Sequence, residues 1–197
     1  MKRQVILIHG GEAWGTYEEY MNFLRTTKLA NPVTEQPKKW GHSFAEKLGD
    51  NFQLITPQMP CAWNAKYDEW KIWFEKYIPY VHDGVVLIGN SLGGIFLTKY
   101  LSENIFPKKI ESLHLLAAPF GDRSCGKAGF TLGNSLEKIE QQVSHIHLYQ
   151  SKDDPVVDFG DFEAYAEALP SAKKHIFKNS GHFQVKEFPE LLNNIKE

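Results

Sequence analysis

Six short apolar segments recur along the chain and constrain its fold more than any other feature. Each is brief, largely apolar and in most cases continuous, as expected of strands that are covered on both faces of a sheet. The candidate strands are 4–8, 53–56, 85–88, 112–117, 146–150 and 174–177. Segments with helical periodicity alternate with them, at 67–78, 92–101, 135–143, 159–169 and 183–195. This alternation predicts an α/β fold with about six mainly parallel strands and helices on both faces of the sheet.

Length and composition fit one globular domain. The chain has 197 residues, of which 42% are hydrophobic and 23% charged. A chain of this size buries about 70% of its unfolded surface, so we expect a single domain over residues 1–197. Two long loops are predicted. One lies within 28–37, where it could separate two helices, and the glycine-rich other spans 119–133.

Charge and cysteine usage exclude several classes of protein. The formal net charge is −2 with both signs interspersed, which leaves no basic footprint for nucleic acid or an anionic membrane. No apolar stretch approaches the roughly 20 residues that span a bilayer. The apolar run at 5–8 is shorter than a signal-peptide core. Cys61 and Cys125 match no metal or redox spacing. We therefore expect a cytoplasmic protein with free thiols.

A serine between glycines follows the third candidate strand, in the stretch VVLIGNSLGG. The pattern Gly89-x-Ser91-x-Gly93 at a junction of strand and helix is typical of a nucleophile elbow, whose tight turn leaves no room for side chains at the glycines. The helix that begins at Leu92 would point its unpaired N–H groups at the serine. The alternative is an ordinary tight turn in which the serine only caps the helix.

Candidate partners for the serine follow the last two strands. Asp153 and Asp154 come after the fifth strand, and His182 comes after the sixth. Serine, acid and histidine in this order, at the carboxyl ends of parallel strands, predict a Ser-His-Asp triad. Taken singly, the aspartates could form a turn and the histidine could begin a helix. Pro155 restricts Asp154 to an extended conformation and so gives it a defined geometry.

The loops after the other strands supply the rest of the expected site. Glycines after the first strand bring backbone close to the serine, so the N–H groups of Gly11 and Leu92 are the candidate oxyanion hole. His9 is expected to hold this loop in place. Trp63, Phe120 and Phe130 are candidates for the substrate pocket.

No metal or other cofactor is expected. His145 and His147 share one face of a strand, but the sequence shows no third ligand for a metal beside them.

Over nearly its whole length the sequence resembles an α/β-hydrolase, and more narrowly the small serine hydrolases of the retinoblastoma-binding protein 9 and YdeN type. The more specific mark is the stretch with Ala65, Tyr67 and Trp70 after Met59-Pro60. The other marks are His9-Gly10-Gly11, Gly89–Gly94, Leu116–Pro119, Ser151–Val157 and Gly181–Phe183. The resemblance implies that Ser91 is the nucleophile, Asp154 the acid and His182 the base, with no large cap domain.

The chain departs from that family at three points. Asn90 stands where a histidine commonly precedes the nucleophile, and Asp158 replaces a usual proline. Neither Cys61 nor Cys125 has the context of the retinoblastoma-binding motif, so that partner is not expected.

These features predict a serine hydrolase that forms an acyl-enzyme, most simply a carboxylesterase acting on a small-molecule acyl ester. An amidase or peptidase, a thioesterase and a non-catalytic binding protein remain as alternatives. The sequence predicts neither the natural substrate nor the oligomeric state.

Overall fold

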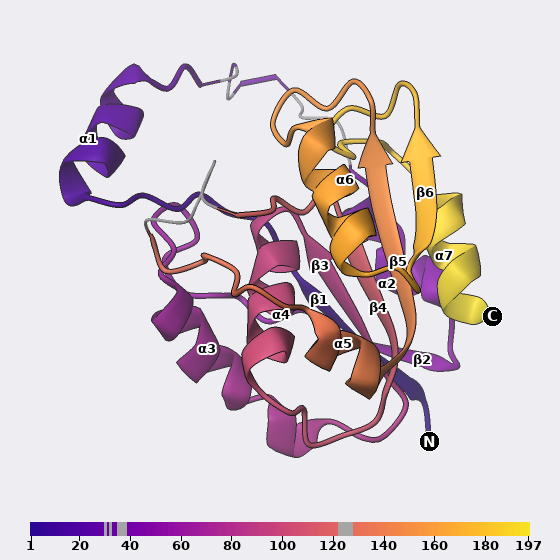
Figure 1. Ribbon diagram of the computed structural model, residues 1–197. Coiled ribbons are helices and arrows are strands. Elements are labelled where there is room, and N and C mark those ends of the chain that lie inside the picture. Colours follow the sequence, from indigo (N-terminus) through magenta and orange to yellow (C-terminus); the bar gives the residue numbers. More distant parts are fainter. Residues whose placement is uncertain (30, 32, 35–38, 122–127) are drawn as a thin grey trace.

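A computed structural model describes residues 1–29, 31, 33–34, 39–121 and 128–197 (Figure 1). In this part of the chain six strands form one sheet in the order β2-β1-β3-β4-β5-β6, and every neighbouring pair is parallel. The strands are β1 (Arg3–Ile8), β2 (Phe52–Ile55), β3 (Val85–Asn90), β4 (Ile110–Leu116), β5 (Val143–Ser151) and β6 (Lys173–Phe177). The predicted sheet is thus confirmed, with strand ends that differ by a few residues from those expected.

Helices cover both faces of the sheet (Figure 1). One face carries α3 (Tyr67–Glu75), α4 (Leu92–Glu103), α5 (Glu137–Gln142) and α6 (Phe159–Ala168), and the other carries α2 (Phe44–Leu48) and α7 (Pro189–Lys196). Short 3₁₀ helices, η1 (Trp40–Ser43) and η2 (Ile78–Tyr80), complete the described elements. None of the described helices has the length and apolarity needed to cross a membrane.

The two faces of the sheet bury separate hydrophobic clusters. Trp70, Phe74 and Phe96 pack ring against ring beneath α3 and α4. Phe44 and Phe188 belong to the cluster under α2 and α7. A sheet buried on both faces in this way explains why its strands are continuously apolar in the sequence.

The first helix, α1 (Tyr17–Thr26), stands away from the sheet (Figure 1). A capping box between Thr16 and Glu19 fixes its start, yet none of its residues is buried. Phe23 contacts Trp14 and Trp63, with ring centroids 4.8 and 6.1 Å apart. Its contact with Trp63 connects the helix to the loop that follows β2.

The last helix is shorter than the predicted 183–195, because it begins only at Pro189. Phe183 has a φ of 48°, which is incompatible with a right-handed helix. Its ring stacks on that of Phe188, with centroids 4.8 Å apart, so the segment before α7 serves to fill the core.

Two predicted features lie partly or wholly outside the described residues. Of the two expected loops, 28–37 and 119–133, only parts are described, and Cys125 lies outside them.

Candidate active site

Strand β3 passes into α4 through Ser91, which has a φ of 52°. A Cβ at Gly89 would lie 2.5 Å from the carbonyl oxygen of Gly93, and a Cβ at Gly93 would collide with the carbonyl oxygen of Ile8. The glycines are therefore required by the close packing of α4 on the strands. The Ser91 N–H donates to the Leu116 carbonyl over 2.8 Å, which anchors the turn between two strands. This is the strained serine geometry of an elbow, with Ser91 half-buried at the turn.

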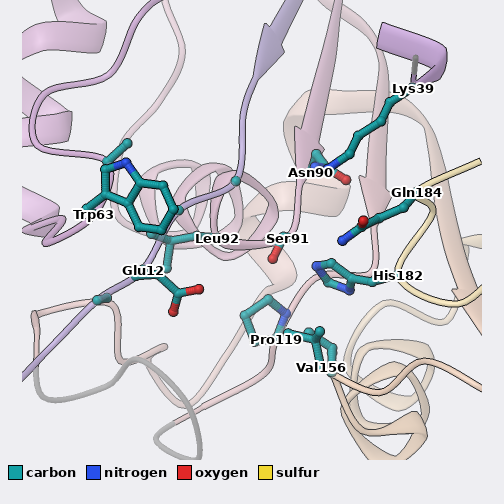
Figure 2. A pocket seen from close by; sticks show the side chains of 15 residues that line it. Glu12, Lys39, Trp63, Asn90, Ser91, Leu92, Pro119, Val156, His182 and Gln184 are labelled. Atoms are coloured by element: carbon teal, nitrogen blue, oxygen red, sulfur yellow. The ribbon is translucent and has the colours of Figure 1, made fainter. Parts of the chain in front are cut away.

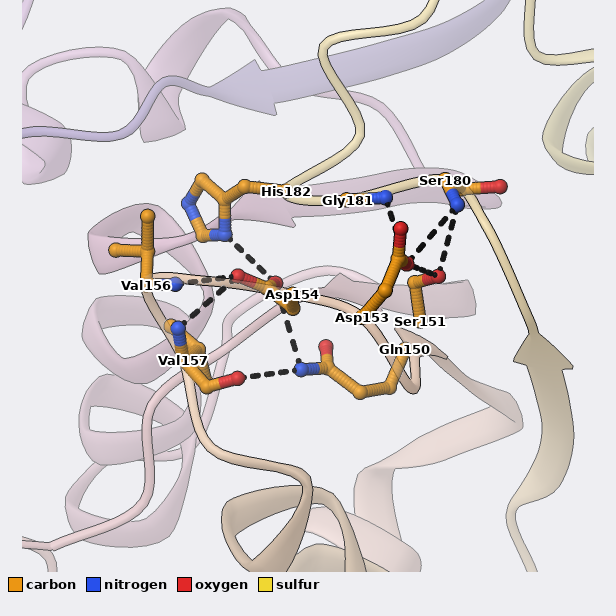
Figure 3. A network of polar contacts seen from close by, with 9 residues as sticks. All are labelled: Gln150, Ser151, Asp153, Asp154, Val156, Val157, Ser180, Gly181 and His182. Atoms are coloured by element: carbon orange, nitrogen blue, oxygen red, sulfur yellow. Dashed lines mark hydrogen bonds and ion pairs between the residues drawn. The ribbon is translucent and has the colours of Figure 1, made fainter.

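Asp154 and His182 form a close pair at the carboxyl ends of β5 and β6. Nδ1 of His182 lies 2.8 Å from Oδ2 of Asp154 (Figure 3). The side chains are almost inaccessible, with 13% of His182 and 1% of Asp154 exposed. The other carboxylate oxygen, Oδ1, accepts the N–H groups of Val156 at 2.8 Å and Val157 at 3.1 Å. A carboxylate oxygen in this position accepts a hydrogen bond from the imidazole, so the contact places a proton of His182 on Nδ1 and leaves Nε2 directed elsewhere.

The adjacent Asp153 serves a different purpose. Its Oδ1 accepts the Ser151 hydroxyl at 2.5 Å and the N–H groups of Ser180 and Gly181 at 3.1 and 3.0 Å (Figure 3). The Ser151 hydroxyl and these amides lower the pKa of the Asp153 carboxyl. Asp153 thus holds the loop that carries His182, while Asp154 contacts the imidazole itself.

A pocket of about 500 Å³ brings the separate elements together (Figure 2). Its wall includes Ser91 and His182, together with the two candidate oxyanion residues, Gly11 and Leu92. The serine hydroxyl and the imidazole ring face the same hollow. Four residues that were predicted from distant parts of the sequence therefore meet at one place.

Comparison with known proteins agrees with this geometry. A family model described as "Serine hydrolase" matches residues 33–193. The chain belongs to the serine hydrolase family. The rat (Rattus norvegicus) protein "Serine hydrolase RBBP9" is 29% identical over 161 residues, which cover 80% of this chain and 83% of the rat protein.

Solved structures show that this serine hydrolase has the α/β-hydrolase fold. The ydeN gene product of B. subtilis aligns with a TM-score of 0.73 at 18% identity, covering 99% of this chain and 97% of that one. A YdeN-like hydrolase from Pectobacterium atrosepticum aligns with a TM-score of 0.67 at 15% identity, covering 98% and 89%. The predicted fold class, without a large cap domain, is confirmed for the described residues.

His9 holds the first loop of this serine hydrolase, as expected. Its Nε2 accepts the Met59 N–H over 2.9 Å, so Nδ1 carries the proton and donates to the Gly10 carbonyl over 2.6 Å. The ring also contacts the edge of Trp70, with centroids 5.6 Å apart. These contacts place Gly11 beside the elbow.

The three predicted pocket aromatics occupy different environments. Trp63 lines the pocket and is 63% exposed. Phe120 adjoins the pocket residue Pro119, but its ring packs edge-on against Tyr165, with centroids 4.8 Å apart, and it is not part of the pocket wall. Phe130 is wrongly predicted as a pocket residue, because it is fully buried in the core.

The position of Phe130 has a simple packing cause. Its ring makes edge contacts with Tyr67 and Trp70, with centroids 5.9 and 5.7 Å apart. It therefore fills the core beneath α3 and is absent from the wall of the pocket.

Several pocket residues were not predicted from the sequence. They are Glu12, Lys39, Asn90, Pro119, Val156, Val157 and Gln184, in addition to the small residues around the elbow. Desolvation raises the pKa of Glu12, while the electrostatic effect of His182 acts in the opposite direction. Only their places in the sequence could have indicated two of these pocket residues, since Glu12 directly follows Gly11 and Asn90 directly precedes Ser91.

His147 belongs to a row of stacked rings on β4, β5 and β6. We call His114, His147 and His175 the histidine stack, because their rings lie 4.6 and 5.3 Å apart in that order. Burial lowers the pKa of all three, and it lowers that of His147 to about 4. Parallel stacked rings cannot converge on one ion, and the described residues contain no group of three side chains suited to a metal.

Proposed function

We propose that this serine hydrolase acts by acyl transfer to Ser91, with His182 as general base and Asp154 as the acid that orients it. The observation that supports this most strongly is the buried contact of 2.8 Å between His182 Nδ1 and Asp154 Oδ2, beside a serine held at φ 52° in the same pocket. A histidine oriented by an aspartate next to a strained serine is the arrangement that activates a hydroxyl nucleophile.

The reaction proceeds in two halves. Nε2 of His182 takes the proton of Ser91 as Oγ attacks the carbonyl carbon, and the resulting imidazolium gives that proton to the leaving group. Water then attacks the acyl-enzyme with the same base, and Ser91 regains its proton as the acid product departs. Asp154 stabilises the imidazolium in both halves, since one of its oxygens is already held by the backbone of residues 156 and 157.

The negative charge that develops on the carbonyl oxygen needs hydrogen-bond donors. The N–H groups of Gly11 and Leu92 are the proposed donors, because both residues line the pocket with Ser91. Leu92 is the first residue of α4, so its N–H lacks a partner within the helix and lies at the positive end of the helix dipole.

The proposed substrates are carboxylic esters with a small acyl group, cleaved without a cofactor. The pocket volume of about 500 Å³ is in the range of small-molecule sites. Amides and thioesters could use the same groups, so the choice among acyl derivatives is a matter for measurement. A purely binding role is the less economical alternative, because it gives no reason for a strained serine beside a buried His-Asp pair.

Labelling with a fluorophosphonate tests the proposal. We expect one label per chain on Ser91, and no labelling or ester hydrolysis by Ser91→Ala. Ser135→Ala, at an exposed serine outside the pocket, is the matched control and should label as the wild type does. Stoichiometric labelling of folded Ser91→Ala would show that another residue is the nucleophile.

A further inference from the structure

Among the described residues that line the pocket, Glu12 is the one that carries a carboxylate. Its side chain forms no hydrogen bond or ion pair with any residue that the structure describes. The side chain is exposed, but the surrounding protein displaces enough water to raise its pKa, as noted above. No described side chain therefore pairs with this carboxylate in the pocket.

The backbone holds Glu12 in a fixed position. Its N–H donates to the Ala62 carbonyl and its carbonyl accepts the Ala65 N–H, each over 2.8 Å. Two bonds to one neighbouring loop leave little freedom to the main chain here. The carboxylate extends from this anchored position toward the hollow that Ser91 faces (Figure 2). A ligand group in the pocket would thus contact a carboxylate whose backbone is held in one position, as selective binding requires.

The proposed proton transfer from His182 to the leaving group indicates which part of a substrate would contact the Glu12 carboxylate. The leaving group receives its proton from His182 and so lies on the His182 side of Ser91. Glu12 and Trp63 lie on the opposite side of Ser91, and Lys39 extends from the His182 side (Figure 2). The acyl group, whose carbonyl oxygen would face the N–H groups of Gly11 and Leu92 on this side, is therefore the part of a bound substrate that can reach Glu12 and Trp63.

Trp63 strengthens the case for a positive group on that side. Its ring lines the same part of the pocket and is largely exposed. An indole face attracts a cation, and a carboxylate nearby adds a charge-assisted hydrogen bond. An uncharged acyl group would gain from the indole alone and would leave the carboxylate partly desolvated without compensation.

We propose that Glu12 and Trp63 form a subsite for a positively charged acyl group, so that the preferred substrates carry an ammonium group in the acyl part. This inference rests on the proposed function of Ser91, and it names the substrate class for that site. The role of Glu12 is to bind and discriminate, and it takes no part in proton transfer.

A pair of nearly isosteric esters tests the subsite. Phenyl β-alaninate and phenyl butanoate differ by an ammonium group in place of a methyl group at the end of the acyl chain. Wild-type enzyme should show the higher kcat/KM for the β-alanine ester. In Glu12→Gln the ratio of the two kcat/KM values should fall by roughly 10- to 100-fold, as expected for loss of a hydrogen bond between charged groups. Glu167→Gln removes the same charge at an exposed position on α6 and should leave the ratio unchanged.

The outcomes separate the subsite from the catalytic proposal. A ratio that Glu12→Gln leaves unchanged, or an equal fall for both esters, would overturn the subsite while hydrolysis of phenyl butanoate still supports the acyl transfer. If neither ester is hydrolysed, the labelling rates of phosphonofluoridates with 2-aminoethyl and propyl substituents give the same ratio. Absence of labelling by either reagent would overturn the catalytic proposal and the subsite with it.

Discussion

Acid should destabilise this serine hydrolase at a pH where most carboxylates are still ionised, because its histidine stack is neutral in the folded state. Burial is the main cause of the low pKa values of His114 and His147, and the other histidines of the stack add to it. In the unfolded chain an imidazole binds its proton near pH 6.5. Below that pH the unfolded state binds more protons than the folded state, so stability is complete above about pH 6.5 and is lost as the pH falls toward the folded pKa.

The size of the effect follows from the shifted pKa. With a pKa of about 4 in the folded state and 6.5 unfolded, His147 lowers the free energy of unfolding by ~2 kcal/mol between pH 8 and pH 5. Burial also lowers the pKa of His114 well below 6.5, so His114 acts in the same direction. The ~2 kcal/mol from His147 alone is a substantial part of the roughly 5–15 kcal/mol by which native domains are stable.

Urea unfolding at a series of pH values from 8 to 5 measures this loss directly. His147→Gln should reduce the dependence of the unfolding free energy on pH by about 1.4 kcal/mol per pH unit, the contribution of one proton. His82→Gln, at an exposed residue outside the histidine stack, is the matched control and should leave the dependence unchanged.

Two results would refute this reasoning. A free energy of unfolding that stays level from pH 7 to pH 5 would show that the stacked histidines accept protons in the folded state. If the free energy of unfolding depends equally on pH in wild type and in His147→Gln, groups other than His147 cause the loss of stability in acid.

Four substitutions test other parts of the structure. Phe130→Ala should lower the free energy of unfolding in urea by roughly 3–5 kcal/mol, because it removes a buried ring and leaves a cavity. It should leave the preference for acyl-chain length nearly unchanged. A stable variant with an altered preference would contradict the assignment of Phe130 to the core. Asp154→Asn should lower kcat by about 10⁴-fold. Asp153→Asn should lower kcat by less than about tenfold, because the asparagine oxygen can still accept the loop N–H groups. The reverse ranking in steady-state kinetics would make Asp153 the orienting acid. Ser91→Gly should be inactive but more stable by roughly 1 kcal/mol in thermal unfolding, because glycine relieves the strain of φ 52°; an unchanged melting temperature would show that the turn is not strained.

The sheet was predictable because its strands are buried on both faces and are therefore apolar without interruption. The start of the last helix was not, since periodicity alone cannot separate a helix from a loop whose aromatic side chains fill the core. Phe183 and Phe188 fit the helical pattern, yet the first has a positive φ and the second precedes the true start at Pro189. Tertiary packing decided the backbone conformation there.

The proximity of Ser91, Asp154 and His182 was predictable for a topological reason. Parallel strands bring their carboxyl ends to one edge of the sheet, so residues that follow different strands meet there. The direction of a side chain in a loop has no such rule. Phe130 turns into the core and Glu12 turns into the pocket, and both directions depend on packing contacts that no local pattern encodes.

The order of the strands also determines when during folding the serine becomes reactive. Strand β1 inserts between β2 and β3, so Val5 pairs with Val86 and the loop at Gly11 reaches the elbow only through contacts distant in sequence. His182 arrives from the opposite edge, after β6 has docked on β5. Such long-range parallel pairings form slowly, because chain entropy is lost before the contacts are gained. We therefore expect a partly folded chain to lack the proposed arrangement around Ser91, so that acyl transfer requires the complete sheet.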